Sequence, residues 1–222
     1  MKCPQCQTGT LRALRGVLSC TRFPVCRHKE TYHFQVATSS SSKSYIVFDY
    51  ETSGRSHRHD KIIEIGAVKV RNGQVVDEFE ALVNPGTYIS AVITQITGIR
   101  NSDLIGKPTE EEILPAFIKW IGDVDFMVAH NLSFDARFLK AACIRLGLPL
   151  FSGEGVCTLQ TARTLNIPSA NNKLGTLCDY FGISLVNAHR AIEDVRSTQQ
   201  LFERLKERGD VPYKAFSEFC KS

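Results

Sequence analysis

The sequence predicts an α/β protein in which one mixed sheet, flanked by helices, follows a small cysteine-rich module. Four of the eight cysteines fall within the first 26 residues, and the polar tract ATSSSSKS separates them from the rest of the chain. Beyond the tract, three strand-like segments precede alternating helix-like and strand-like ones, a pattern typical of a mixed sheet. We therefore expect a cysteine module at 1–36, a flexible linker at 37–44, a main domain at 45–208 and a C-terminal tail at 209–222.

The cysteine module has the ligand spacing of a metal site. Two pairs, one with the spacing CxxC and one with five intervening residues, allow four thiolates to converge on one tetrahedral Zn²⁺. About 35 residues cannot build a sufficient core, so the metal would supply much of the folding free energy. The expected ligands are Cys3, Cys6, Cys20 and Cys26, whereas the dispersed Cys143, Cys157, Cys178 and Cys220 are expected to be ordinary thiols.

Charge divides unevenly between the two parts of the chain. Residues 1–36 hold six Lys and Arg against one Glu, a net of +5, whereas the remaining residues hold 21 basic against 22 acidic side chains. A basic module favours a polyanionic partner, although a structural module with a solvated basic face is an open alternative.

In the main domain, each expected element follows from a local pattern. Asn72-Gly73 between two alternating apolar segments predicts a tight hairpin, and Thr109 followed by Glu112 predicts a capped helix start. The expected strands are 45–51, the two arms of the hairpin, 124–130 and 155–158, and the expected helices are 109–121, 132–146, 173–181 and 191–207.

Four carboxylates occupy positions where apolar residues are expected. Asp49 and Glu51, in FDYETSG, project to the same side of a buried strand near its C-terminal end. Asp135 precedes the apolar stripe of the 132–146 helix, and Asp194 shares a helical face with Leu201. A single acid of this kind is more often a helix cap or an ion-pair partner. Four of them favour convergence on divalent cations, for which oxygen ligands indicate Mg²⁺ or Mn²⁺.

His189 lies five residues before Asp194 in AHRAIEDV. Five helical residues turn through about 140°, so both side chains cannot line one site from a single helix. We therefore expect His189 in the preceding loop, where an imidazole beside a metal-bound water is suited to act as a general base.

The segments FDYETSG, HNLSFDARFL and HRAIEDV resemble the three motifs of the DEDDh exonuclease family, which includes the proofreading subunit of bacterial DNA polymerase III. The resemblance spans about residues 45–205 and implies an RNase H-like fold and removal of nucleotides from 3′ ends with two metal ions. It assigns Asp49, Glu51, Asp135 and Asp194 to the metals and His189 to deprotonation of the attacking water. It also assigns Thr52, Thr97 and Asn131 to substrate binding.

The cysteine module resembles the four-cysteine zinc ribbons of bacterial type IA topoisomerases, which bind single-stranded DNA. This resemblance covers residues 3 to about 30 and rests on CPQC and SCTRFPVC. It implies nucleic-acid binding by basic and aromatic side chains, namely Arg12, Arg15, Arg22, Arg27, Lys29, Phe23 and Tyr32.

Together these patterns predict a cytoplasmic 3′→5′ exonuclease acting on single-stranded DNA in repair or end trimming. An exoribonuclease is the first alternative, because the catalytic residues act on phosphate and do not identify the sugar. A non-catalytic nucleic-acid tether is the second. No apolar run approaches the length of a membrane span. The sequence leaves open whether the protein forms a homodimer, as some related enzymes do.

Overall fold

The computed structural model describes residues 11–14, 17–20, 29–31, 43–185 and 189–221, and the chain divides into two compact units, Met1–Ser41 and Ser42–Ser222. In the first unit, β1 (Leu11–Leu14), β2 (Val17–Cys20) and β3 (Lys29–Thr31) form an antiparallel sheet in that order. Of the residues expected to bind zinc or nucleic acid, Arg12, Cys20 and Lys29 lie on these strands, and the structure describes only their backbone. The remaining expected zinc ligands and basic or aromatic contacts lie outside the described residues: Cys3, Cys6, Cys26, Arg15, Arg22, Arg27, Phe23 and Tyr32.

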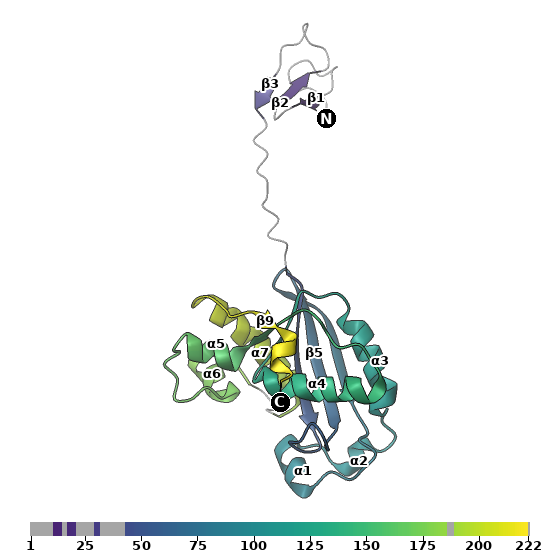
Figure 1. The fold of residues 1–222 in the computed structure, drawn as a ribbon. Helices are drawn as coiled ribbons and strands as arrows, with labels where there is room; N and C mark the ends of the chain where they lie inside the picture. The colour runs from purple at the N-terminus through teal and green to yellow at the C-terminus, as the bar shows by residue number, and fades with distance from the viewer. Residues whose placement is uncertain (1–10, 15–16, 21–28, 32–42, 186–188, 222) are drawn as a thin grey trace. The chain divides into compact units, whose positions relative to one another are not determined.

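The second unit is built on a six-stranded mixed sheet (Figure 1). Its order is β6-β5-β4-β7-β8-β9. Neighbouring strands are antiparallel except at β4–β7 and β7–β8, which are parallel. The strands are β4 (Tyr45–Thr52), β5 (Ile62–Arg71), β6 (Gln74–Leu82), β7 (Phe126–Ala129), β8 (Glu154–Cys157) and β9 (Lys214–Ala215).

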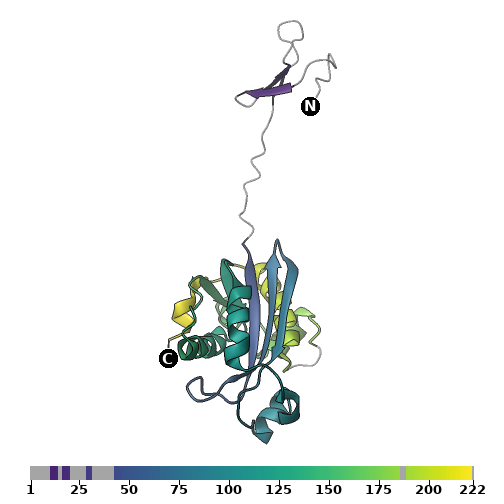
Figure 2. The same ribbon diagram turned by 90° about the vertical axis from the view of Figure 1, so that its right-hand side faces the viewer.

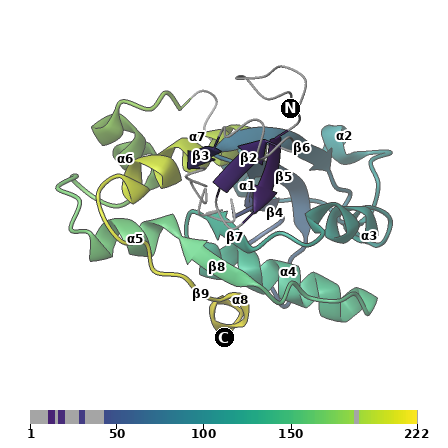
Figure 3. The same ribbon diagram turned by 90° about the horizontal axis from the view of Figure 1, so that it is seen from above.

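Helices cover both faces of this sheet (Figure 3). On one face, α7 (Ala191–Lys206) packs on β4 and β5 through an apolar cluster that includes Val47, Val195 and Phe202. On the other face, α3 (Glu110–Ile121), α4 (Leu132–Leu146) and α8 (Phe216–Phe219) close the larger core, which contains Phe48 and Phe117. The alternation of β4 therefore directs Asp49 and Glu51 toward the α7 face, and it directs Phe48 and Tyr50 toward α3 and α4.

Local signals in the sequence produce the expected elements. Asn72 and Gly73 have φ values of 55° and 75°, as the tight turn between β5 and β6 requires. The capping box at Thr109 forms, because Glu112 accepts the Thr109 backbone N–H at 2.8 Å. The helix expected at 132–146 begins and ends at those residues.

Several short elements escaped sequence analysis. They are α1 (Ala91–Thr97), α2 (Asn101–Leu104), α5 (Thr158–Thr164), β9 and α8, whereas α6 (Leu174–Phe181) was expected. Elements of two to seven residues are too short to show a periodicity. Figure 2 shows α1 and α2 beyond one end of the sheet.

The C-terminal segment is a packed part of the second unit rather than a simple tail. Phe216 is fully buried in the larger core, and β9 pairs with β8. Within the described ranges, we find no helix whose length and apolarity would suit a bilayer crossing.

Candidate active site

Three elements bring acidic side chains together at one end of the sheet. Glu51 on β4, Asp194 in the first turn of α7 and His189 just before that helix each offer a ligand atom within 4.8 Å of the others. Asp49 lies two residues before Glu51 on the same face of β4. Asp49, Glu51 and Asp194, three of the four acids expected to converge, therefore lie close together on the α7 side of the sheet.

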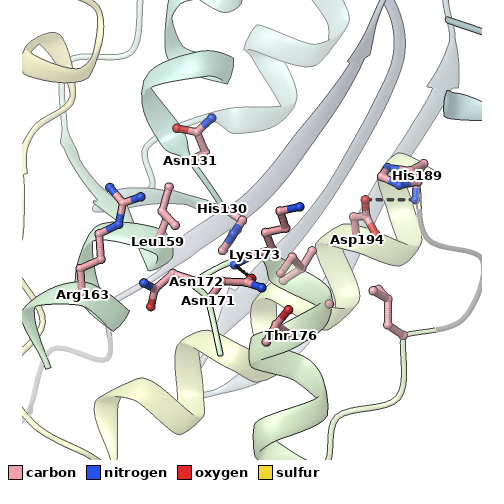
Figure 4. A pocket seen from close by; sticks show the side chains of 13 residues that line it. His130, Asn131, Leu159, Arg163, Asn171, Asn172, Lys173, Thr176, His189 and Asp194 are labelled. Carbon is pink, nitrogen blue, oxygen red and sulfur yellow. Dashed lines mark hydrogen bonds between the residues drawn. The ribbon is translucent and has the colours of Figure 1, made fainter. Parts of the chain in front are cut away.

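His189 lies in the turn before α7, as the helical spacing predicted. Its backbone is left-handed, with φ 69°, and its N–H donates to Asp194 Oδ2 at 3.2 Å (Figure 4). This hydrogen bond ties the imidazole-bearing turn to the carboxylate of the following helix.

Asp135 approaches from the other side of β4. It lies in the first turn of α4 and is 2% exposed, and its Oδ1 accepts the backbone N–H of Tyr50 at 3.2 Å. Because Tyr50 lies between Asp49 and Glu51, this bond holds the Asp135 carboxylate against the strand that carries the other two acids.

Burial raises the pKa values of all four carboxylates, and repulsion within the cluster adds to the shift at Asp49, Glu51 and Asp135. Burial and then the Asp194 charge raise the pKa of Asp49 to about 8, and burial and then the Asp49 charge raise that of Glu51 to about 9. Burial is also the main cause of the raised pKa values of Asp135 and Asp194. Without a cation, this cluster disfavours its ionised form.

The residues present fit divalent cations. Asp194 Oδ1 is buried and has no hydrogen-bond partner in the described part of the chain, so one carboxylate oxygen is left available for a ligand. Carboxylate oxygens are the donors that Mg²⁺ and Mn²⁺ prefer. A positive ion would also remove the repulsion that raises the pKa values of these acids.

Glu64 on β5 fixes the start of α7, a role that sequence analysis missed. It is fully buried, and its carboxylate accepts the Ala191 N–H at 3.0 Å and pairs with Arg190 at 2.7 Å. Two residues along the strand, a Cβ on Gly66 would lie 2.4 Å from the Ala191 carbonyl carbon. Glu64 and Gly66 thus hold the first turn of α7 against the sheet, with His189 just before that turn and Asp194 within it.

Replacing Glu64 with Gln is therefore expected to reduce turnover at least tenfold and to lower the free energy of unfolding by about 1–3 kcal/mol, since it leaves Arg190 with only the half-exposed Glu80, at 3.7 Å, as a charged partner. The measurement is kcat together with chemical denaturation. Glu78→Gln is the matched control. It removes the 2.8 Å ion pair of Glu78 with Arg196, and both of these side chains are exposed on the outer side of α7. Equal effects of the two substitutions would contradict the positioning role.

A cavity of about 830 Å³ opens beside Asp194 and His189. Its other walls come from the ends of β7 and α5 and from the start of α6, and Figure 4 shows polar and basic side chains of these segments around it. They include His130, Asn131, Arg163, Asn172 and Lys173. Asn131 was expected at the site, whereas its chain neighbour His130 and the residues of α5 and of the loop before α6 were not.

His130 is held neutral in this cavity. Burial is the main cause that lowers its pKa to about 4, and its Nδ1 lies 3.0 Å from Thr158 Oγ1. The ring is therefore a neutral hydrogen-bonding group rather than a cation, and its partners are Thr158 and the backbone of Asn172.

Thr52 and Thr97 lie outside this cavity wall, and their hydroxyls bond to nearby backbone. Thr52 Oγ1 donates to Gly54 O at 2.6 Å, and Thr97 Oγ1 donates to Ile93 O at 3.0 Å and accepts the Ile99 N–H. These contacts hold the turn after β4 and the end of α1.

A mixed sheet of this order, with acids from the central strand and two flanking helices gathered at one end, defines the RNase H-like class of nucleases. The chain belongs to the exonuclease family (RNase_T), whose family model matches residues 46–202. The motif resemblance is thereby confirmed for the main domain, and exonucleases of this family use divalent metal ions.

Among curated proteins, the chain is similar to DNA polymerase III PolC-type of Caldanaerobacter subterraneus subsp. tengcongensis, with 40% identity over 181 residues. The match covers 81% of this chain and 13% of that protein. The PolC-type polymerase of Staphylococcus aureus is 40% identical over 170 residues, covering 75% of this chain and 12% of the polymerase. The chain thus spans about an eighth of the length of these relatives.

Among solved structures, exonuclease X in complex with 5′ overhanging duplex DNA has a TM-score of 0.62 and 26% identity, covering 80% of this chain and 99% of that one. E. coli exonuclease I with a dT13 oligonucleotide has a TM-score of 0.66 and 20% identity, covering 75% and 41%. The second likeness shows the shared fold.

Proposed function

We propose that the protein is a 3′→5′ exonuclease that hydrolyses phosphodiester bonds at the 3′ end of single-stranded DNA and releases 5′-nucleotides. The observation that carries this proposal is the placement of Glu51, His189 and Asp194 within 4.8 Å of one another beside the 830 Å³ cavity. The PolC-type relatives and the DNA complexes of exonucleases X and I support DNA as the substrate.

The four carboxylates would hold two divalent cations, Mg²⁺ or Mn²⁺. Asp49, Glu51 and Asp194 face one side of β4 and would bind directly, whereas Asp135 approaches from the α4 side. When bound, such a pair of ions activates water as a nucleophile and stabilises the charge on the leaving 3′ oxygen.

His189 is assigned the role of general base. Its turn is held by the bond from its N–H to Asp194, so the imidazole stays beside the acids without occupying the helix that carries Asp194. The ring would accept a proton from the attacking water as the new O–P bond forms and the bond from phosphorus to the leaving 3′ oxygen breaks.

The cavity is assigned to the terminal nucleotides of the substrate. Arg163 and Lys173 bring positive charge to its wall, which suits phosphate oxygens, and the Asn131 side chain offers hydrogen bonds to sugar or base. Arg163 and Lys173 gave no sequence signal, because neither lies in one of the three motifs, whereas Asn131 lies in the motif HNLSFDARFL.

The first 36 residues are assigned to a zinc ribbon that binds single-stranded DNA. Cys3, Cys6, Cys20 and Cys26 would hold one Zn²⁺, and Arg12, Arg15 and Arg22 would contact phosphates. A tethered second binding site would raise the local concentration of substrate at the active site.

A direct test of the zinc assignment is the substitution of Cys3 and Cys6 by Ser, which is expected to remove one equivalent of zinc, measured by atomic emission on purified full-length protein. Cys143→Ser is the control, because Cys143 is a buried thiol of the larger core. If Cys143→Ser loses zinc and the variant with Ser at positions 3 and 6 retains it, the zinc is bound by other residues than those proposed.

The test of the proposed function uses 5′-labelled single-stranded DNA, duplex DNA and RNA with Mg²⁺ or Mn²⁺. The expected result is a ladder that shortens from the 3′ end of single-stranded DNA. Preferential shortening of RNA would replace DNA with RNA in the proposal. Binding of single strands with no cleavage under either metal would leave a nucleic-acid tether and would overturn the enzymatic assignment.

A further inference from the structure

A second polar cleft, of about 360 Å³, lies on the outer side of α4 and shares no lining residue with the active-site cavity. One wall is the loop between β4 and β5, and the other is the solvent-facing side of α4. We refer to it as the α4 cleft, and its lining residues are His57, Arg58, Arg137, Lys140, Ala141, Ile144, Arg145 and Cys220.

Both walls continue elements that carry catalytic acids. The loop leaves β4 directly after Glu51 and Thr52, and α4 carries Asp135 in its first turn. Arg137 and Lys140 lie two and five residues after Asp135, so they point about 200° and 140° away from it around the helix. The α4 cleft therefore lies on the other face of the helix that delivers Asp135 to the active site.

The charge of the α4 cleft is strongly positive. Arg145 is neutralised, since it contacts both oxygens of the buried Glu110 at 3.0 and 2.7 Å. Within the part of the chain that the structure describes, Arg58, Arg137 and Lys140 form no ion pair. Arg137 donates from Nε to Ser133 O at 2.7 Å, and Lys140 makes one long contact, 3.4 Å, with Cys220 O.

His57 lies in the positive electrostatic field of these cations. Its ring packs edge-on against Phe138, with centroids 6.4 Å apart, and burial followed by the charges of Arg137, Arg58 and Lys140 lowers its pKa. Three cations thus lie near one imidazole ring in a concave surface. A chain of phosphates is the ligand whose repeated negative charge matches this arrangement.

We propose that the α4 cleft binds backbone phosphates of the DNA substrate outside the strand end that occupies the active-site cavity. The inference rests on the proposed nuclease function and adds a second contact region in the same unit. Because the contacts are to phosphate, they would increase affinity for long strands regardless of base sequence.

The test compares cleavage of a 30-nucleotide single strand with cleavage of a dinucleotide by the full-length protein. The triple variant Arg58→Gln, Arg137→Gln and Lys140→Gln is expected to raise KM for the long strand about tenfold. It is also expected to reduce the salt dependence of log KM by about 2, or about 0.7 for each lost phosphate contact. Its kcat/KM for the dinucleotide should fall no further than that of a control.

The matched control replaces Arg71, Lys119 and Lys214 with Gln, three exposed cations outside both cavities, so the same net charge is removed. Equal effects of the two triple variants on the long strand would overturn the proposal, as would a parallel loss on the dinucleotide. Arg58→Gln alone, at an exposed loop position, replaces the triple variant if thermal unfolding shows that the latter does not fold.

The two proposals fail in distinguishable ways. Absence of cleavage of either substrate by the unsubstituted protein would overturn the proposed function. Normal cleavage by the unsubstituted protein, with no difference between the two triple variants, would overturn only the proposal that the α4 cleft binds phosphates.

Discussion

Asn in place of Asp49 is expected to reduce the rate of strand shortening by at least about 10³-fold, or about 4 kcal/mol of transition-state stabilisation. Asp49 lies on the central strand, between the acids of α4 and α7, and it contributes to the raised pKa values of both Glu51 and Asp135. An amide keeps the size of the side chain but lacks the charge needed to hold divalent cations. The measurement is single-turnover cleavage of labelled DNA.

The same substitution is expected to stabilise the metal-free protein. The pKa of Asp49 rises from 3.8 to about 8 on folding, so its unfavourable ionisation in the folded state is absent at pH 4 and develops as the pH rises toward 8. Asp49→Asn removes this effect, and its advantage in the free energy of unfolding should grow to about 1–3 kcal/mol at pH 8 in EDTA. Chemical denaturation between pH 5 and 8 measures the difference.

Asp123→Asn is the control for both measurements, because Asp123 is an exposed acid in the loop before β7. Addition of Mn²⁺ should raise the thermal midpoint of the unsubstituted protein and of the control, and should have little effect on Asp49→Asn. A control that gains as much stability as Asp49→Asn would show that net charge, rather than the cluster, sets the pH dependence.

The core of the site could be predicted because each acid interrupts a periodic apolar pattern. Asp135 and Asp194 occupy helical positions that face the core, and Asp49 lies in a strand whose apolar residues are all buried. Such positions are unfavourable for an isolated carboxylate, so the pattern itself indicates a shared cation. Helix geometry likewise placed His189 outside α7.

The role of Glu64 could not be predicted from the same pattern. This residue stands between Ile63 and Ile65 in a buried strand, which is the same signal that Asp49 gives, yet its partners are the backbone of Ala191 and the side chain of Arg190. Sequence pattern detects a buried acid and does not say whether a metal or a helix start satisfies it.

The cavity wall could not be predicted for a different reason. Arg163, Asn172 and Lys173 belong to α5 and to the loop before α6, and only tertiary packing brings these segments opposite His189. Their spacing in the sequence carries no period that relates them to the acids. The α4 cleft is similar, because its loop residues and its helix residues are about 80 positions apart.

Replacement of His189 by Asn is expected to reduce kcat about 10²- to 10⁴-fold while leaving cation binding in place. Asn is the suitable substitution because residue 189 has a left-handed backbone, with φ 69°, which Asn tolerates, so the N–H to Asp194 bond can persist. The amide cannot accept the proton of the attacking water.

The stabilisation by Mn²⁺ separates a general base from a metal ligand at this position. His189 offers a nitrogen within 4.8 Å of the Glu51 and Asp194 oxygens, a distance that also suits coordination. If His189 acts only as the base, His189→Asn keeps the Mn²⁺-dependent rise in thermal midpoint that Asp49→Asn loses. Loss of that rise in both variants would assign His189 to the metal and would require a different proton acceptor. Because the two variants differ in this one readout, the carboxylates and the imidazole can be assigned separate roles at a site where all of them are neighbours.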